Sequence, residues 1–379
     1  MNKRKVAIIQ NRFQRGGRMQ VIIHMVKQLN KRCIVPDLLS FQSNITKDDI
    51  KNAYGEDIEF TFKDIFMNLR IPFEWNILCF NFISRFYLKN YDLVINSNNT
   101  SFLLPKDINM VSYVHFPRKK RNIIPQKSIH FSKGNKKKLL DVKSDLFKIA
   151  HYLYRFDRSI SKRDLQLANS DYTKETLLSL YPLGKQEVKV MYPPVNVSSD
   201  KNNTPKKRQV VSLGRFSPDK RQLEQVKIAQ QIPELEFHLY GFVNSNTYYN
   251  TIESYIAHHS IDNVHLHPNA PFDDIKNALA ESAFFLHSLR REPFGITTVQ
   301  AIQNGCIPVV HNSGGQAEIV SEKTLRYENV DEAIDIIKRL NRKKDSVLDN
   351  YRSSLRNNIE NYSAQKFEQE FDKILEEKL

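Results

Sequence analysis

The chain has 379 residues, of which 40% are hydrophobic and 26% charged, as is typical of a soluble globular protein with room for two domains. It contains no run of about 18 apolar residues, which argues against a membrane-spanning helix, and its basic start has too few apolar residues for a signal peptide. The three cysteines, Cys33, Cys79 and Cys306, have no CxxC spacing and predict a reduced, cytoplasmic protein without disulfides.

Positive charge is concentrated in the first half. Residues 1–200 contain 34 Lys and Arg against 18 Asp and Glu, whereas the remainder contains 23 against 24. Two basic runs, RKKR at 118–121 and KGNKKK at 133–138, contribute to this excess. The first half therefore either has an ordinary solvated basic surface or faces an anionic partner, namely a membrane surface, a phosphorylated acceptor or nucleic acid.

Short apolar runs alternate with helical segments from the start of the chain. In the first half, strands are expected within residues 5–10, 91–97, 109–116, 165–170 and 188–197. A helix is expected up to about Asn30, and another begins near Asp171 and Thr173, which are good capping residues. The aromatic segment at 71–89 is either a half-buried helix or a helix on a membrane surface.

The second half repeats this alternation. Strands are expected within 209–216, 236–242, 263–268, 283–288 and 306–311, with helices between them and an amphipathic helix at the C-terminus. Such alternation predicts parallel sheets with right-handed crossovers, hence an α/β protein of two Rossmann-like domains that face a central cleft. We expect the domains at 1–197 and 208–358, a polar linker at 198–207, and a helix at 359–379 that packs back toward the first domain.

Two pairs of residues follow predicted strands, where open α/β sheets bind their ligands. Gly16 and Gly17 lie between the first strand and the first helix, where bare N–H groups either approach a phosphate or form a tight turn without a ligand. Arg215 and Lys220 follow the first strand of the second half. A guanidinium fork and a lysine suit a diphosphate, and the alternative is a solvated loop.

The stretch REPFGITTVQ, residues 291–300, follows the strand expected at 283–288. The N–H groups of Gly295, Ile296 and Thr297 are expected to be unpaired at a helix start, where they can bind hydroxyls or phosphate oxygens. Glu292 precedes them, and Gln300 lies about two helical turns further on, near the same face. A carboxylate here can simply complement the helix dipole, but that explanation leaves the NSGG sequence after the next strand without a role.

These residues resemble the retaining glycosyltransferases of family 4, which have the GT-B fold. The family pattern is E-x-F-G, then E-A, G-x-P-V-V and G-G-x-x-E. The segment GRFSPDK is similar to the Arg/Lys pair with which the family holds the diphosphate. The segment SYVHFPRK is similar to the strand end that carries the family's active-site histidine, which is His115 here. The segments YVHFP, YPPV and HNSGG most resemble the subgroup that extends lipid-linked oligosaccharides with mannose. The matching positions are Glu292, Phe294, Gly295, Gln300, Ala301, Gly305, Pro308, Val309, Val310, Gly314, Gly315 and Glu318.

The resemblance implies transfer of a hexosyl group from a UDP- or GDP-sugar to a glycan or lipid-linked acceptor, with retention of anomeric configuration, in cell-surface polysaccharide or glycolipid synthesis. It implies that Arg215 and Lys220 hold the diphosphate, that Glu292 binds the donor sugar, and that His115 lies near the reacting sugar through its backbone carbonyl. No metal or other cofactor is implied, and the sequence has no Asp-x-Asp triplet. The implied donor site is Gly16, Gly17, Arg215, Lys220, Glu292, Phe294, Gly295, Ile296, Thr297 and Gln300.

Gln300 departs from the family pattern, which has a glutamate that accepts two hydrogen bonds from the ribose. A glutamine keeps one acceptor and loses the charge, which weakens the nucleotide contact by about 1–2 kcal/mol. Three interpretations remain: an active enzyme with an altered ribose contact, an enzyme for a deoxyribose donor, or an inactive relative that binds a partner.

The resemblance places the acceptor at the first domain, which carries the positive charge. The run after His115 is therefore expected on the acceptor or membrane side, with the protein peripheral at the inner, cytoplasmic face of an anionic membrane. A basic nucleic-acid-binding protein is the alternative from another class. No nucleic-acid module is recognisable, so no nucleic-acid partner is expected. The run consists of Arg118, Lys119, Lys120 and Arg121.

Overall fold

A computed structural model of the chain describes residues 4–10, 13, 16–40, 46–64, 87–98, 108–117, 164–181, 188–196, 204–243 and 246–379. The chain divides into two compact units. Unit 1 contains Met1–Met191 and Phe367–Leu379, and unit 2 contains Tyr192–Lys366. The division after Met191 lies upstream of the linker expected at 198–207, and the last thirteen residues of the sequence belong to unit 1.

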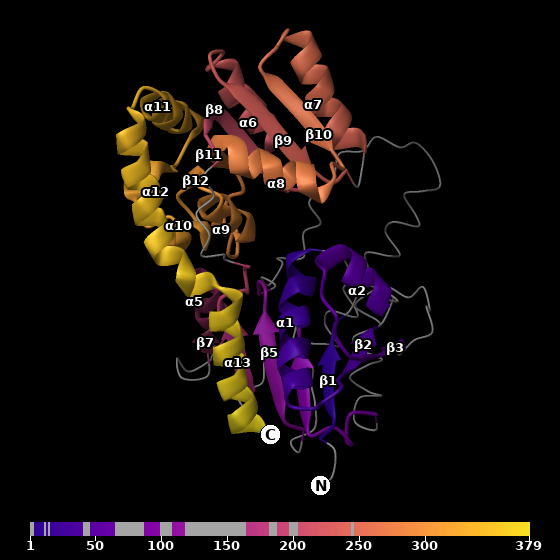
Figure 1. Cartoon of the computed structure of the whole chain (residues 1–379). Helices are drawn as coiled ribbons and strands as arrows, with labels where there is room; N and C mark the ends of the chain where they lie inside the picture. Colours follow the sequence, from indigo (N-terminus) through magenta and orange to yellow (C-terminus); the bar gives the residue numbers. More distant parts are fainter. Residues whose placement is uncertain are drawn as a thin grey trace. The chain divides into compact units, whose positions relative to one another are not determined.

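Unit 1 is built on a parallel sheet whose order, among the described strands, is β3-β2-β1-β4-β5-β6-β7 (Figure 1). Every residue of β1, β4 and β5 is buried, as expected for central strands of a parallel sheet covered on both faces. The described elements are β1 Val6–Ile9, α1 Gly17–Lys31, β2 Asp37–Ser40, α2 Lys47–Tyr54, β3 Thr61–Asp64, β4 Leu93–Asn96, β5 Met110–Val114, β6 Leu165–Ala168, α5 Asp171–Leu180, β7 Val188–Val190 and α13 Ala364–Lys378.

Unit 2 has a second parallel sheet, ordered β10-β9-β8-β11-β12-β13 (Figure 1). Its central strands β11 and β12 are buried throughout. The described elements are β8 Lys207–Leu213, η3 Pro218–Lys220, α6 Gln222–Gln230, β9 Glu236–Gly241, α7 Asn246–His258, β10 Val264–Pro268, α8 Phe272–Glu281, β11 Ser282–His287, α9 Ile296–Gln303, β12 Ile307–His311, α10 Gln316–Ile319, η4 Lys323–Leu325, β13 Arg326–Tyr327, α11 Val330–Asn341, α12 Asp345–Ile359 and η5 Glu360–Tyr362.

Each strand expected from the sequence is present, with ends that differ by a few residues. The cap of α5 differs from the expectation. The side chain of Ser170, rather than Asp171 or Thr173, caps this helix by accepting a hydrogen bond from the Thr173 N–H at 3.0 Å. The three strands that were not expected, β2, β3 and β13, lie toward or at the edges of the two sheets.

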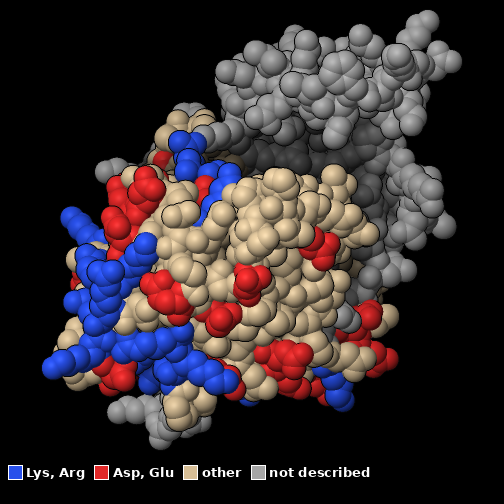
Figure 2. All heavy atoms as spheres, turned by 90° about the horizontal axis from the view of Figure 1, so that it is seen from above, with Lys and Arg blue, Asp and Glu red and all other residues tan. Residues whose placement is uncertain are grey.

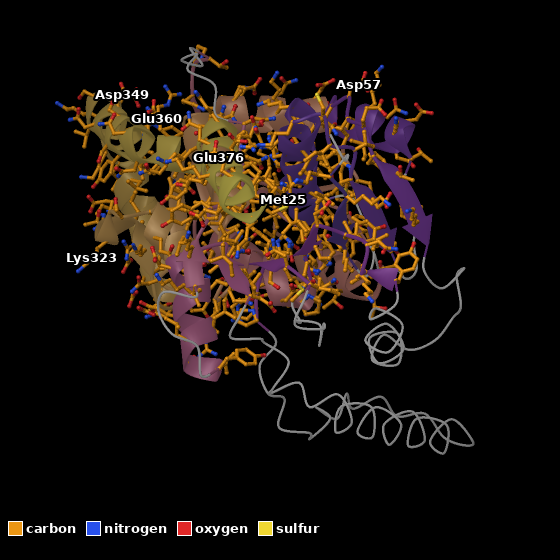
Figure 3. All side chains as sticks on the ribbon, turned by 90° about the horizontal axis from the view of Figure 1, so that it is seen from below. Met25, Asp57, Lys323, Asp349, Glu360 and Glu376 are labelled. Carbon is orange, nitrogen blue, oxygen red and sulfur yellow. The ribbon has the colours of Figure 1, made fainter. Side chains whose placement is uncertain are left out.

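The C-terminal helix α13 packs against α1 within unit 1. Figures 1 and 3 show the two helices side by side, with Met25 labelled on α1 and Glu376 on α13. Arg32 Nε, just after α1, donates to Asp372 Oδ1 at 2.8 Å. Because α1 begins at the glycine pair, α13 supports the helix that positions these glycines. The buried side chains of α13 are Phe367, Phe371, Ile374 and Leu375.

Charge is distributed unevenly on the surface. On the face drawn in Figure 2, Lys and Arg gather along one side, whereas most of the remaining described surface is neutral with scattered Asp and Glu. In unit 2 the last turn of α11 carries Lys338 and Arg339, and Arg342 and Lys344 are exposed directly after it. Cations at the end of a helix complement its dipole, which is sufficient to account for this group.

Candidate functional site

The order of each sheet reverses at one point, between β1 and β4 in unit 1 and between β8 and β11 in unit 2. Open parallel sheets bind ligands at the carboxyl ends of the strands that flank such a reversal. Arg215 and Lys220 follow β8, and Glu292 follows β11, so all three lie at the reversal of unit 2. The candidates of unit 2 are thus placed where the topology favours a ligand.

Lys220 and Glu292 form an ion pair across this reversal. Lys220 is the last residue of η3, and its Nζ donates to Glu292 Oε2 at 2.8 Å. Their side chains are only 25% and 15% exposed. Water screens such a pair less than it screens a surface pair, so the attraction is stronger than that of an exposed salt bridge. The two residues that the sequence assigned to neighbouring parts of a donor therefore contact each other directly.

His287 is a third member of this group, and it was not among the predicted site residues. It is the last residue of β11, and its Nε2 lies 3.5 Å from Glu292 Oε2. Burial, followed by the charge of Lys220, lowers the pKa of His287 to about 4, and the charge of Glu292 only partly opposes this shift. The imidazole is therefore neutral at physiological pH. A polar residue at the end of a buried strand, directly before the candidate loop, was the available sequence signal.

The NSGG turn after β12 holds the backbone of the Glu292 loop. Gly315 N–H donates to Glu292 O at 2.8 Å, and Arg291 N–H donates to Ser313 Oγ at 2.8 Å. Gly314 has a φ of +79°, and a Cβ atom there would lie 2.3 Å from Glu292 O. Only glycine allows this approach. The role left open by the sequence is thus to fix the loop that carries the carboxylate.

The helix α9 begins at Ile296, four residues after Glu292. The expectation that Glu292 and Gln300 share a helical face is therefore wrong, because Pro293 and the positive φ of Gly295, +116°, interrupt the helix between them. Gln300 lies on α9 and is half-buried. The Thr298 N–H donates to Gly295 O within the chain. The first turn of α9 contains no acidic residue whose charge would offset the positive end of the helix dipole. Its N-terminal dipole is thus available to an anion or a hydroxyl.

The side chain of Phe294 is packed in the core of unit 2. The ring is 2% exposed and packs against Tyr192 and Tyr362, with ring centroids 5.7 and 5.4 Å away. The buried ring helps to fix the loop between Glu292 and α9, and the place of Phe294 in the donor-binding set stays a prediction.

Arg215 is the most exposed cation of the unit 2 site. Its side chain is 51% exposed, and one Nη lies 3.6 Å from the carboxylate of Asp219. Gln222 Nε2 donates to the Arg215 carbonyl at 2.8 Å and holds the backbone at this turn. The guanidinium thus retains solvent access from a fixed backbone position.

In unit 1, Gly16 and Gly17 occupy the turn between β1 and α1. Gly16 has a φ of +134° and precedes Gly17, the first residue of α1. The Gly16 N–H donates to the hydroxyl of Tyr54 at 2.7 Å, a contact that the sequence did not indicate. A Cβ atom at Gly16 would meet no atom within 4 Å. Glycine is therefore favoured at this position by its backbone conformation and not by crowding from neighbouring atoms.

His115 follows β5 and is held on both sides. Its Nε2 lies 3.0 Å from Ser97 Oγ, after β4, and its carbonyl accepts a hydrogen bond from Asn169 Nδ2 at 2.8 Å. Burial, followed by the charge of Arg18, lowers the pKa of His115 well below its ordinary value, so the ring is neutral. Ser97 and Asn169 are positioning residues that sequence reasoning did not identify. They lie 18 and 54 residues from His115 and are brought to it by the sheet order.

Several sequence predictions fall outside the described residues. They include both basic runs, among them Arg118 to Arg121, and most of the aromatic segment at 71–89. Within the described ranges, no three His, Cys, Asp or Glu side chains are grouped so that they could hold a metal ion. In the same part of the chain, no helix combines the length and apolar character needed to cross a membrane.

Residues 196–366 match the family model described as Glycosyl transferases group 1, which covers nearly all of unit 2. The chain is 28% identical over 254 residues to a human protein named GDP-Man:Man(3)GlcNAc(2)-PP-Dol alpha-1,2-mannosyltransferase, a match that covers 59% of this chain and 51% of the relative. The protein of the same name from Candida glabrata is 26% identical over 226 residues, covering 54% and 44%. The chain thus spans about half the length of the curated relatives it matches.

Solved structures resemble the chain over almost its whole length. A glycosyltransferase from Rickettsia africae aligns with a TM-score of 0.68 at 16% identity, covering 100% of this chain and 99% of the other. Anabaena HepE, solved in complex with UDP and glucose, aligns with a TM-score of 0.67 at 16% identity, covering 98% and 99%. These likenesses confirm the expected GT-B class of two Rossmann-like, parallel-sheet domains.

Proposed function

We propose that this chain transfers a hexosyl group from a nucleotide-diphosphate sugar to a glycan or lipid-linked acceptor, because unit 2 matches the model of glycosyl transferases group 1. The observation that carries the proposal is the group formed by Lys220, Glu292 and His287 at the carboxyl ends of β8 and β11. The cation suits the diphosphate of such a donor and the carboxylate suits its sugar hydroxyls, while His287 approaches the same carboxylate oxygen as Lys220.

The chemistry of the reaction explains this division. Breaking a glycosyl–phosphate bond places negative charge on the leaving diphosphate and positive charge on the sugar. Lys220 and the exposed Arg215 supply cations for the diphosphate, whereas Glu292 supplies a carboxylate for sugar hydroxyls. Because these cations can neutralise the leaving group, we propose that transfer proceeds without a metal ion. Retention of configuration is proposed from the resemblance to the family alone.

The donor and acceptor are proposed from the relatives. The curated proteins are named for GDP-mannose and a dolichol-linked acceptor, and Anabaena HepE was solved with UDP and glucose. GDP-mannose is therefore the first donor to test and UDP-glucose the second. An acceptor linked to a lipid phosphate fits the basic first half of the sequence, which has 34 Lys and Arg against 18 Asp and Glu.

The proposed activity is tested with a thermal-shift panel of GDP, UDP and their sugars, followed by measurement of donor hydrolysis with and without EDTA. Binding of one nucleotide family and slow release of its diphosphate are expected. Glu292→Gln is expected to abolish turnover. A panel in which no nucleotide binds, or a Glu292→Gln variant with unchanged turnover, would refute the proposal.

Peripheral attachment to the inner face of an anionic membrane is proposed from the same charge excess. Flotation with vesicles that contain or lack anionic lipid tests it. We expect binding only to anionic vesicles and its loss at high salt. Equal flotation with neutral vesicles, or none with either, contradicts this location.

A further inference from the structure

The Lys220–Glu292 ion pair joins two side chains that, in the proposed function, serve different parts of the donor. We propose that the donor diphosphate takes Lys220 from Glu292 when it binds, and that His287 then keeps the Glu292 carboxylate in position for the sugar. This exchange rests on the proposed function and specifies how its donor site is assembled.

The geometry of Lys220 allows the exchange. Its side chain is 25% exposed, its stem is flexible, and it leaves the chain at the end of a short 3-10 turn rather than from within a long helix. It lies 2.8 Å from one carboxylate oxygen of Glu292, so Lys220 cannot give all its interaction to a phosphate without loosening this contact. The diphosphate therefore competes with Glu292 for one ammonium group.

The His287 side chain has less freedom to move than that of Lys220. Its side chain is 4% exposed and extends from the end of a fully buried strand, so it has little freedom to follow a ligand. Its Nε2 lies 3.5 Å from the same oxygen, Glu292 Oε2, that Lys220 contacts. When Lys220 leaves, a neutral imidazole with a proton on Nε2 can close this short gap and donate to the carboxylate. His287 is thus a positioning residue for Glu292.

The other contacts of Glu292 do not provide this function. The NSGG turn holds its backbone, through the hydrogen bond from Gly315 N–H to Glu292 O at 2.8 Å. That contact leaves the side-chain torsions free. Among the described residues, the ion-pair contacts of the Glu292 carboxylate are with Lys220 and His287. Removal of both would therefore release the side chain while the loop stays in place.

The exchange is tested by a double-mutant cycle on binding of GDP or UDP, whichever the wild type binds. Glu292→Gln frees Lys220 and is expected to tighten diphosphate binding about 3- to 10-fold. In a Lys220→Met background the same change is expected to have no effect, because there is no ammonium to release. A merely repulsive carboxylate would tighten binding equally in both backgrounds, and that result would overturn the exchange.

Glu281→Gln is the matched control for the carboxylate change. Glu281 pairs with Lys207 at 2.5 Å at the opposite, amino end of β8. Its loss removes the same charge from the same unit, and diphosphate affinity is expected to stay within about twofold. If the wild type binds neither GDP nor UDP, the proposed function fails; if it binds and the cycle is additive, the exchange alone fails.

The role of His287 is tested by two amide substitutions of different length. A glutamine amide can occupy the position of Nε2 and donate, whereas an asparagine amide is too short to reach it. We expect His287→Asn to lower kcat about 10-fold with diphosphate affinity unchanged, and His287→Gln to restore most of kcat. Equal effects of both variants, or a loss confined to KM, would refute positioning. Thermal unfolding of both variants checks that they are folded.

Discussion

Gly314→Ala is expected to separate the position of Glu292 from the stability of unit 2. The backbone of Gly314 has a φ of +79°, which costs an alanine about 1–2 kcal/mol. Its Cβ atom would also lie 2.3 Å from Glu292 O, 2.7 Å from Glu292 N and 2.8 Å from Arg291 C. These are backbone atoms, so relief of the contact requires the Glu292 loop to move by about 1 Å. A displacement of that size costs about 100-fold in rate.

Gly305→Ala is the matched control. Gly305 lies in the same unit with a φ of +82°, but a Cβ atom there would meet Cε of the Lys206 side chain at 3.1 Å rather than the backbone of the Glu292 loop. Gly305→Ala is expected to lose about 1–2 kcal/mol of unfolding free energy, measured by urea denaturation, and Gly314→Ala at least as much because its backbone contact adds to the φ strain. Only Gly314→Ala is expected to lose donor turnover. Equal turnover in the two variants would show that the NSGG turn does not position the carboxylate.

Three further predictions follow from burial and hydrogen bonding. His287 has a pKa of about 4 in the folded protein and about 6.5 when unfolded, so this group lowers the free energy of unfolding by roughly 3 kcal/mol as the pH drops from about 6.5 to 4. In denaturation at stepped pH, His287→Gln should reduce this loss. An unchanged pH profile would contradict the role of His287. Phe371→Ala removes a fully buried ring and should lower the unfolding free energy of unit 1 by about 3–5 kcal/mol. Phe272→Ala, at a side chain that is 76% exposed, should change the unfolding free energy by less than about 0.5 kcal/mol. Asn169→Ala removes the donor to the buried His115 carbonyl and should lower the unfolding free energy, measured by urea denaturation, by about 1–3 kcal/mol. An unchanged unfolding free energy would contradict a stabilising role of this hydrogen bond.

Most of the fold was predicted from the pattern of hydrophobic residues along the sequence. Central strands such as β11, SAFFLH, are buried on both faces and appear as continuous apolar runs. The strands that were not predicted have weaker patterns. β3 is TFKD, which mixes polar and apolar residues, and β13 has only two residues. Both are edge strands, which need less apolar surface, so their sequences contain little to distinguish them from loops.

The candidate site was predictable in position and not in its contacts. Strand ends are readable from the sequence, so Arg215, Lys220 and Glu292 were located at the correct edge of the sheet. Their pairing was not readable, because Lys220 and Glu292 are 72 residues apart and meet only when β8 and β11 become neighbours. The hydrogen bond between Asn169 and His115 depends on sheet order in the same way.

The ion pair also resolves why a carboxylate stands beside a site proposed for a diphosphate. Without a donor, Glu292 and Lys220 neutralise each other, so the approaching diphosphate meets little net repulsion. In the proposed exchange, Lys220 turns to the phosphates and Glu292 keeps an uncompensated negative charge, because its remaining partner His287 is neutral. The cation then lies where negative charge develops on the leaving group, and the anion where positive charge develops on the sugar. Binding of the donor thereby produces the charge separation that stabilises the transition state.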